Sequence, residues 1–315
     1  LPEQKMDAEQ YMVIGGGETM KKKNRIITTS PGDICLDIFV HVFLILVALS
    51  MLIPFMHVIS KAFSADWAII SGKVGIFPVE FNCDSVKHVI TSGTFWNSFG
   101  ISVFVTVVGT LCNLLMSVTT AYVLSKRHLP GVKTMMVLFV FTMLFGGGMV
   151  PNYILMKKLN LLNNLAVLIL PSLISVYNMI IIKSYFEGLP DSVEESARID
   201  GAGNIKILFE IVLPMSTPVL ATIALFYAVY HWNNYMGPLL YINKSTLKPL
   251  QLYLNDILLE AQDTGLDKTN DDLMNITGEG VRSATIVVST LPILLVYPWL
   301  QKYFVKGITI GSVKG

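Results

Sequence analysis

The residue pattern most suited to a specific task lies in a polar segment, residues 183–214. Its members are Glu195-Ser196-Ala197, then after three residues Gly201, and after nine more Ile211-Val212-Leu213-Pro214. His, Cys or paired carboxylates do not recur in the chain at a spacing that catalysis uses. The pattern therefore has to be interpreted through the helices that carry it.

A short helix is predicted to start after Pro190, because Ser192 followed three residues later by Glu195 forms a capping box. Gly201 and Gly203 supply the permissive backbone that ends it. A second helix is indicated by apolar residues at helical spacing, namely Ile205, Leu208, Phe209 and Val212. Held between two membrane spans, the first helix would move both when a force acts on it. An amphipathic connector resting on lipid headgroups is the alternative.

Other residues able to do chemistry are scattered. The cysteines Cys35, Cys83 and Cys112 lack a CxxC spacing, which argues against a zinc site or a redox pair. The glycines at 146–148 are not followed by the lysine of a phosphate-binding loop. These glycines therefore do not form a phosphate-binding loop.

The composition indicates that much of the chain lies in a membrane. Of its 315 residues, 53% are hydrophobic and 14% charged, and the mean hydropathy is +0.60, whereas a soluble domain carries about a quarter charged residues. A net charge of +1 gives no reason to expect nucleic acid as a partner. The predicted class is an all-α integral membrane protein.

Membrane spans need about 20 apolar residues each. Six stretches meet this requirement, at residues 38–59, 95–124, 134–156, 162–182, 215–232 and 283–300. The third is interrupted by the glycines at 146–148 and by Pro151, which indicates either a broken helix beside protein or water, or simply a helix end at the outer surface.

Basic clusters predict the orientation, because lysine and arginine concentrate in cytoplasmic loops. They lie in residues 21–25, in the loop 125–133 and after residue 301, so both termini are expected to be cytoplasmic. Lys157 and Lys158 are exceptions to the rule. We divide the chain into a cytoplasmic tail (1–35, with 1–19 interpreted as disordered or non-native), a transmembrane domain (36–305, containing the loop 183–214) and a cytoplasmic tail (306–315).

The pattern that begins at Glu195 closely resembles the EAA loop of binding-protein-dependent ABC importer permeases, whose form is E-A-A, three residues, G, nine residues, I-x-L-P. Ser196 replaces the first alanine, a small-for-small change, while Asp200 and Ala202 match the frequent D-G-A core. The resemblance extends from about residue 21 onwards. The closing runs at 291–298, 301–307 and 311–315 are similar to the carbohydrate subgroup related to the maltose permease, and residues 145–151 to its complex-polysaccharide, or lipoprotein-type, branch.

The resemblance implies a type I ABC importer permease fold and a subunit that catalyses no reaction and binds no cofactor or metal. It implies a bacterial cell membrane location and a heterodimer with a second permease. Two ATP-binding cassette ATPases would hold ATP and Mg, and an extracytoplasmic sugar-binding protein would deliver an oligosaccharide. The chain would form half of the translocation path.

The family's coupling helix docks in a cleft of the ATPase, and the resemblance assigns residues to this task. The predicted coupling residues are Glu194, Glu195, Ser196, Ala197, Asp200, Gly201, Ala202 and Gly203. Buried packing behind them is expected from Phe209, Leu213 and Pro214. Residues 311–315 are expected to lie near the ATPases.

Sugar sites combine aromatic faces with amides and hydroxyls. The candidates for the substrate path are Asn113, Asn152, Tyr153, Tyr227, Tyr230, His231, Trp232 and Asn233. Tyrosine and tryptophan also gather at membrane interfaces as anchors, so anchoring is the alternative for the cluster at 227–233.

Rival classes are a permease for a non-sugar solute, an ion-coupled secondary transporter and a membrane enzyme. Secondary transporters usually contain intramembrane acidic groups and internal repeats. No acidic residue is central to any of the six stretches, and no catalytic group recurs at a suitable spacing. Both observations favour the importer.

Overall fold

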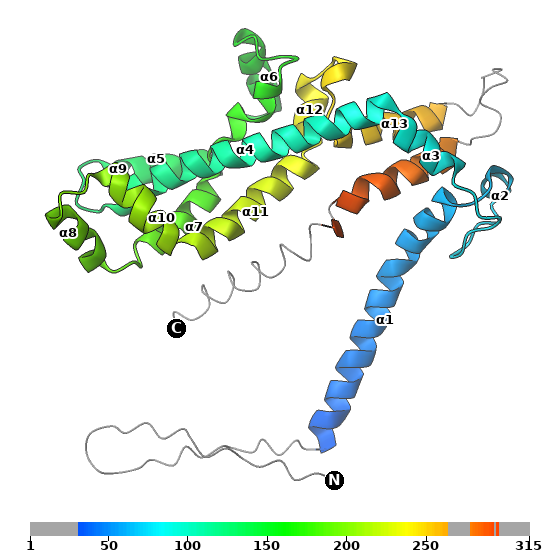
Figure 1. Cartoon of the computed structure of the whole chain (residues 1–315), viewed down its shortest axis with the longest axis horizontal. Helices are drawn as coiled ribbons and strands as arrows, with labels where there is room; N and C mark the ends of the chain where they lie inside the picture. The colour runs from blue at the N-terminus through cyan, green and yellow to red at the C-terminus, as the bar shows by residue number, and fades with distance from the viewer. Residues whose placement is uncertain (1–30, 264–277, 293, 296–315) are drawn as a thin grey trace. The chain divides into compact units, whose positions relative to one another are not determined.

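A computed structural model describes residues 31–263, 278–292 and 294–295, and their regular elements are helical (Figure 1). An isolated antiparallel bridge joins Ser64 and Phe81. The chain divides into two units, residues 1–53 and 54–315, which are described separately. The expected all-α architecture is confirmed for the described residues.

The described part of the first unit belongs to α1 (Pro31–Ala62), which continues into the second unit and contains Pro54. Large apolar side chains of this part are exposed, for example 69% for Phe39 and 61% for Leu46. A helix that is apolar all round requires lipid or another helix about it. The predicted span 38–59 lies within α1.

A small segment follows α1, with α2 (Asp66–Ile70) and α3 (Asp84–Thr91) separated by a loop. It leads into α4 (Gly93–Ser125), where the Ser92 side chain accepts a hydrogen bond from the Phe95 amide and caps the helix. α4 contains the whole predicted second span. α4 and residues 34–62 are each long and apolar enough to cross a membrane as a single helix.

The third predicted span is broken. Its residues form α5 (Val132–Leu144) and α6 (Met149–Lys158), whose axes are bent by 112°. The break begins after Leu144, and Gly148 adopts a φ of +85°, which favours glycine.

The fourth predicted span is also discontinuous, whereas the sequence indicated one helix over 162–182. It consists of η1 (Leu165–Leu168), η2 (Leu170–Ser172) and α7 (Val176–Phe186), with a 49° bend. Pro171 has no amide proton to continue a helical ladder, and Ser175 caps the helix that restarts after it.

The segment that carries the EAA-like pattern contains α8 (Asp191–Ile199), α9 (Asn204–Ile207), η3 (Leu208–Val212) and α10 (Leu213–Met215). An 87° bend separates it from α11 (Thr217–Asn233), which contains most of the predicted fifth span. If each bent pair counts as one crossing, the described residues contain up to five spans.

The predicted outer loop 233–282 contains further helices, α12 (Met236–Tyr241), η4 (Ser245–Leu247) and α13 (Leu250–Asp263). Residues 278–292 are helical and cover the start of the predicted sixth span. The rest of that span and both predicted tails, with the expected ATPase contact at 311–315, lie largely or wholly outside the described residues.

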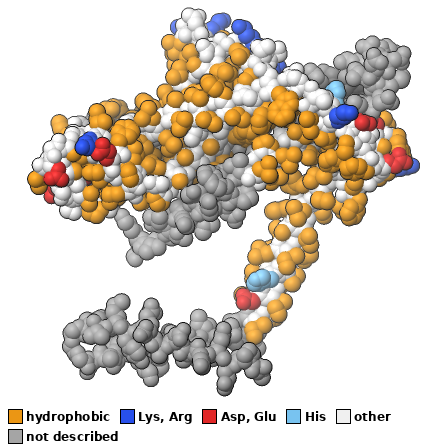
Figure 2. Space-filling model, viewed as in Figure 1, with side chains coloured by type: hydrophobic (Ala, Val, Ile, Leu, Met, Phe, Trp, Pro, Cys, Tyr) orange, Lys and Arg blue, Asp and Glu red, His pale blue; other side chains and the backbone are white. Residues whose placement is uncertain are grey.

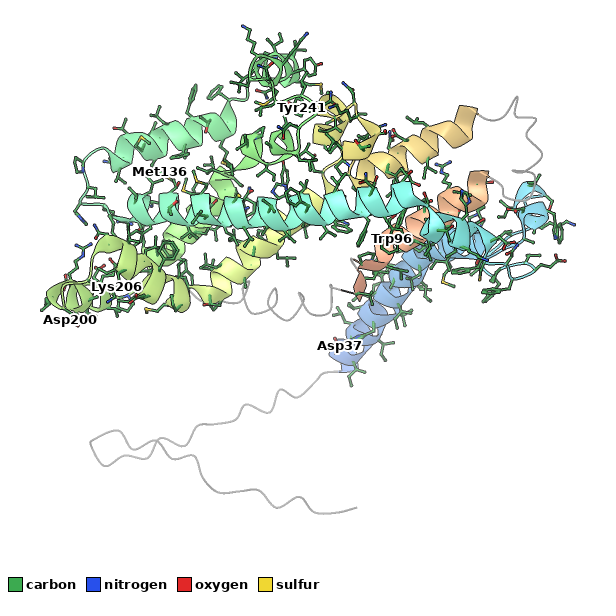
Figure 3. All side chains as sticks on the ribbon, turned by 45° about the horizontal axis from the view of Figure 1, so that its top comes forward. Asp37, Trp96, Met136, Asp200, Lys206 and Tyr241 are labelled. Carbon is green, nitrogen blue, oxygen red and sulfur yellow. The ribbon has the colours of Figure 1, made fainter. Side chains whose placement is uncertain are left out.

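α4 packs along both α7 and α11 in the second unit. Its C-terminal half contributes Ala121 and Leu124 to a buried cluster with Met179 and Ile182 of α7 and Ile223 of α11. Much of the remaining surface is apolar (Figure 2). Figure 3 shows Trp96 near one end of α4, and Asp200 and Lys206 near the other end.

Candidate functional site: the helix α8 and a buried polar cluster

The start of α8 differs from the prediction. Pro190 is the N-cap residue and no side chain hydrogen-bonds there, so the expected capping box is wrong. Asp191 opens the helix, which places Ser192 inside it, and the Ser192 carbonyl accepts a hydrogen bond from Ser196 Oγ at 2.8 Å. Asp191 and Glu194 lie in the first turn, where negative charge suits the helix dipole.

The end of α8 agrees with the prediction. Gly201 has a φ of +81°, and the amide of Ala202 donates to the carbonyl of Ala197 at 2.9 Å, the pattern of a glycine-terminated helix. Gly203 has a φ of −73°, which any residue can adopt. Gly201 alone therefore supplies the special conformation at this exit.

α8 has one inward and one outward face. Ala197 is buried against the cluster that includes Ile207, whereas Glu195, Ser196 and Asp200 are exposed. The prediction missed Ile199, which is 86% exposed and so extends this outward face with an apolar group. Its exposure could have been suspected from its position two residues after the buried Ala197.

Glu194 does not belong to the outward face. Both of its carboxylate oxygens lie 2.5 Å from Lys126 Nζ, and its side chain is only 15% exposed. Arg198 lies 4.0 Å away on the following turn. In this chain Glu194 therefore forms an ion pair with Lys126, the residue that follows α4.

The expected burial behind α8 holds for one residue of three. Leu213 packs against the core, but Phe209 is 48% exposed and Pro214 is exposed, so burial was wrong for these two. The π-helical turn η3 explains the difference, because its wider winding turns Leu208 and Val212 inward in place of the predicted set.

A second ion-pair group lies at the end of α7. Glu187 accepts hydrogen bonds from Arg127 Nε at 3.0 Å and pairs with Lys183 Nζ at 2.9 Å. Burial alone would raise the pKa of the Glu187 carboxyl, but the hydrogen bonds and charges of Arg127 and Lys183 outweigh it and lower the pKa below its usual 4.5.

Three predicted path residues, Asn113, Tyr227 and His231, meet inside the helix packing. The Asn113 Oδ1 lies 3.1 Å from His231 Nε2, and Asn113 Nδ2 donates to the carbonyl of Ser172 at 2.5 Å. Tyr227 is 2% exposed, and its hydroxyl accepts from the Ser175 amide at 3.3 Å. Asn113 thus links His231 to the broken fourth span, and Tyr227 binds that span separately.

The other path candidates lie at or near the surface. Tyr153 stacks on Tyr241 with ring centroids 6.2 Å apart, and Trp232 meets Phe99 edge-on at 6.0 Å. Tyr230 is 50% exposed. Two amide side chains are also exposed, those of Asn152 and Asn233.

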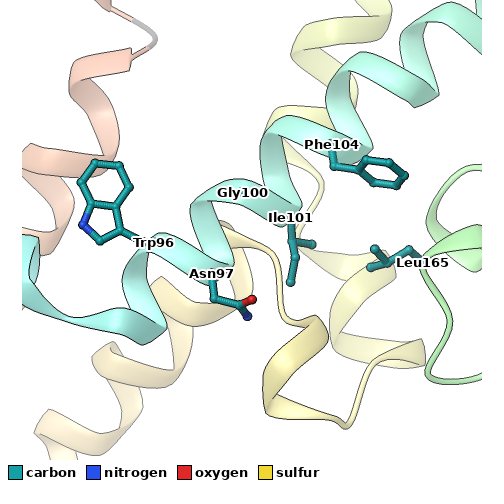
Figure 4. Close-up of a pocket in the computed structure, with 6 residues that line it drawn as sticks. All are labelled: Trp96, Asn97, Gly100, Ile101, Phe104 and Leu165. Carbon is teal, nitrogen blue, oxygen red and sulfur yellow. The ribbon is translucent and has the colours of Figure 1, made fainter.

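An open hollow of about 390 Å³ lies beside the N-terminal half of α4 (Figure 4). Its polar groups are engaged elsewhere, because Trp96 Nε1 donates to the Ile90 carbonyl and Asn97 Nδ2 to the Thr246 carbonyl. The lining residues are Trp96, Asn97, Gly100, Ile101, Phe104 and Leu165. None of the predicted path residues is among them.

Residues 99–310 match the family model described as binding-protein-dependent transport system inner membrane component. The chain is 42% identical over 286 residues to the polygalacturonan/rhamnogalacturonan transport system permease protein YtcP of Bacillus subtilis (strain 168), which covers 89% of this chain and 98% of that protein. It is 45% identical over 267 residues to protein LplC of the same organism, and the match covers 84% of this chain and 90% of LplC.

The structure is similar to a chain in the crystal structure of a bacterial ABC transporter involved in the import of the acidic polysaccharide alginate. The TM-score is 0.81 at 33% identity, covering 87% of this chain and 98% of that chain. The resemblance inferred from the EAA-like pattern is therefore confirmed. The chain belongs to the family of binding-protein-dependent transport system inner membrane components, the non-catalytic permease subunits of ABC importers.

Proposed function

We propose that this chain forms half of the path through which an ATP-driven importer moves an oligosaccharide delivered by an extracytoplasmic binding protein. The relatives named for polygalacturonan, rhamnogalacturonan and alginate transport support this cargo class, and they favour fragments that contain uronic acids as the first to test. A non-sugar solute is the alternative cargo.

The proposed topology has six spans with both termini in the cytoplasm. It counts each bent pair as one crossing and adds the span at 283–300, of which the structure describes the first part. A second, different permease would complete the path. Large apolar side chains on α1 up to Ile53, such as Phe39 and Leu46, are exposed, and an apolar face of a second permease is suited to cover them, as lipid is.

The observation that carries the proposal is the outward face of α8. Glu195, Ser196 and Ile199 are exposed on a helix whose far side is fixed in the core, and Gly201 ends it abruptly. A solvent-exposed isoleucine on such a rigid helix is suited to a cleft in another protein. We assign that cleft to the ATPase, with Asp200, Gly201 and Gly203 at its edge.

Docking is tested by co-purifying the ATPase with variants of the tagged chain. Ile199→Asp places an unpaired charge in the proposed interface, and we expect it to remove most of the bound ATPase. Ile70→Asp is the matched control, since Ile70 is 76% exposed on the short helix α2. Equal ATPase recovery with both variants would refute the docking face.

Cargo and energy source are tested together in vesicles that contain the assembled importer and its binding protein. We expect uptake of labelled oligogalacturonides to require ATP hydrolysis and the binding protein. Uptake that requires neither ATP hydrolysis nor the binding protein would refute the proposal.

A further inference from the structure

We propose that Lys126 and Arg127 form an ionic strap that fixes the cytoplasmic helix α8 to the end of α4. The strap consists of two ion pairs, Lys126 with Glu194 and Arg127 with Glu187, which lie on the two sides of the turn at Pro190. The inference rests on the proposed docking of α8 and adds the route by which its motion reaches the membrane helices.

The pair of Lys126 and Glu194 is the stronger one. The lysine ammonium lies 2.5 Å from both carboxylate oxygens, and the two side chains are 17% and 15% exposed. The same ammonium lies 4.7 Å from the centre of the Tyr122 ring on α4. Breaking a short ion pair that is largely removed from solvent is costly, because one charge is left without its partner.

The pair of Arg127 and Glu187 lies closer to water. The arginine side chain is 82% exposed, so solvent screens the interaction, whereas Glu187 is 16% exposed and also held by Lys183. Its contribution is geometric. Two consecutive residues after α4 hold carboxylates on both sides of the turn at Pro190, Glu187 at the end of α7 and Glu194 on α8.

The strap adds a side-chain connection to those that the backbone provides. α8 is joined to its neighbours through the extended residue Pro190 and through Gly201, and it has one buried residue, Ala197. Arg198 of α8 also interacts with the hydroxyl of Tyr122 on α4, but a helix with so few attachments could swing when pushed. With Glu194 held by Lys126, a displacement of α8 is transferred directly to α4, which packs along α7 and α11.

The test uses charge reversal in the complete importer, reconstituted with its companion permease, ATPases and binding protein. Lys126→Glu and Glu194→Lys each place like charges together, and the double reversal restores an opposite pair. We expect each single variant to reduce the stimulation of ATP hydrolysis by the oligogalacturonide-loaded binding protein about tenfold, or about 1.4 kcal/mol of coupling. The double reversal should recover at least half of it.

Hydrogen exchange of the α8 amides in the same complexes gives a second readout. The single variants should exchange faster over residues 191–199, and the double reversal should return the rate towards that of the wild type. Lys206 and Glu210 provide the control, since this pair is 3.8 Å apart and both side chains are 63% exposed. Reversing it should leave both measurements unchanged.

The strap is refuted if ATP hydrolysis by both single variants is stimulated as strongly as in the wild type. It is also refuted if the double reversal restores neither the stimulation nor the assembly of the complex above the level of the weaker single variant. Failure of the proposed docking gives a different result. In that case the ATPase would not bind the wild-type chain through α8, and Ile199→Asp would have no effect.

Discussion

Gly109 of α4 lies directly against the side chain of His231 on α11. A Cβ atom there would lie 2.5 Å from His231 Nε2, and the ring also hydrogen-bonds Asn113. Real Cβ atoms do not approach other atoms so closely, so any larger residue must displace the histidine and break this hydrogen bond. The helix crossing thus depends on the absence of a side chain at one residue.

We expect Gly109→Ala to destabilise the chain by about 1–3 kcal/mol, the usual cost of overpacking. Gly100→Ala is the control in the same helix, because no atom lies within 4 Å of its added Cβ. Alanine is a better helix former than glycine, so the control should be neutral or stabilising. Thermal unfolding in detergent compares the two, and equal melting temperatures would contradict the close approach.

Glu187 makes stability depend on pH. Its pKa is lowered in the folded chain, so the ionised carboxylate contributes stability that is complete above the usual pKa of 4.5 and is lost as the pH falls through the folded value. Glu187→Gln removes this contribution. We expect its melting temperature to differ most from the wild type near pH 7 and to converge with it in acid; a constant difference would contradict the ion pairs.

At the scale of elements, Gly201 fixes the geometry of α8. Its φ of +81° is unfavourable for residues with a Cβ atom, whereas Gly203 has an ordinary φ. We expect Gly201→Ala to cost about 1–2 kcal/mol and to weaken ATPase binding. Gly203→Ala should leave the free energy of unfolding unchanged, because its φ suits any residue. Thermal unfolding compares the two variants, co-purification measures ATPase binding by Gly201→Ala, and equal melting temperatures of the variants would refute this role of Gly201.

The sequence predicted elements well where a single local signal decides. α4 was recognised by its apolar length, and the end of α8 by Gly201, because a left-handed turn requires glycine. The start of α8 was misjudged, since Pro190 can begin a helix as well as Ser192 can cap one. The break after Ser172 escaped detection because side chains of other helices satisfy its backbone groups.

The candidate site could be predicted only in part. The EAA-like spacing identified α8, but the partners of Glu194 and the exposure of Phe209 depend on tertiary contacts and on the π-helical turn. For the same reason, the polar residues Asn113 and Tyr227 were read as path candidates. A sequence shows that a group is polar within a span, but not which neighbour already binds it.

For the whole molecule, the proposed topology predicts opposite exposure of two positions. Cys83 lies between α2 and α3 on the proposed outer side, and Ser196 lies on α8. With Cys35 and Cys112 replaced by alanine, a membrane-impermeant maleimide should label Cys83 in intact cells. In a further variant, Ser196→Cys with Cys83→Ala, labelling should require permeabilised cells. The reverse pattern would invert the topology.

The break in the fourth span limits how the bundle can rearrange. The free carbonyl of Ser172 is bound by Asn113 of α4, and the free amide of Ser175 by Tyr227 of α11. Separating these helices would leave both backbone groups unsolvated in hydrocarbon, at several kcal/mol each. α4, α11 and the broken fourth span should therefore move as one block. Any surfaces that slide past one another during transport must then lie outside this block.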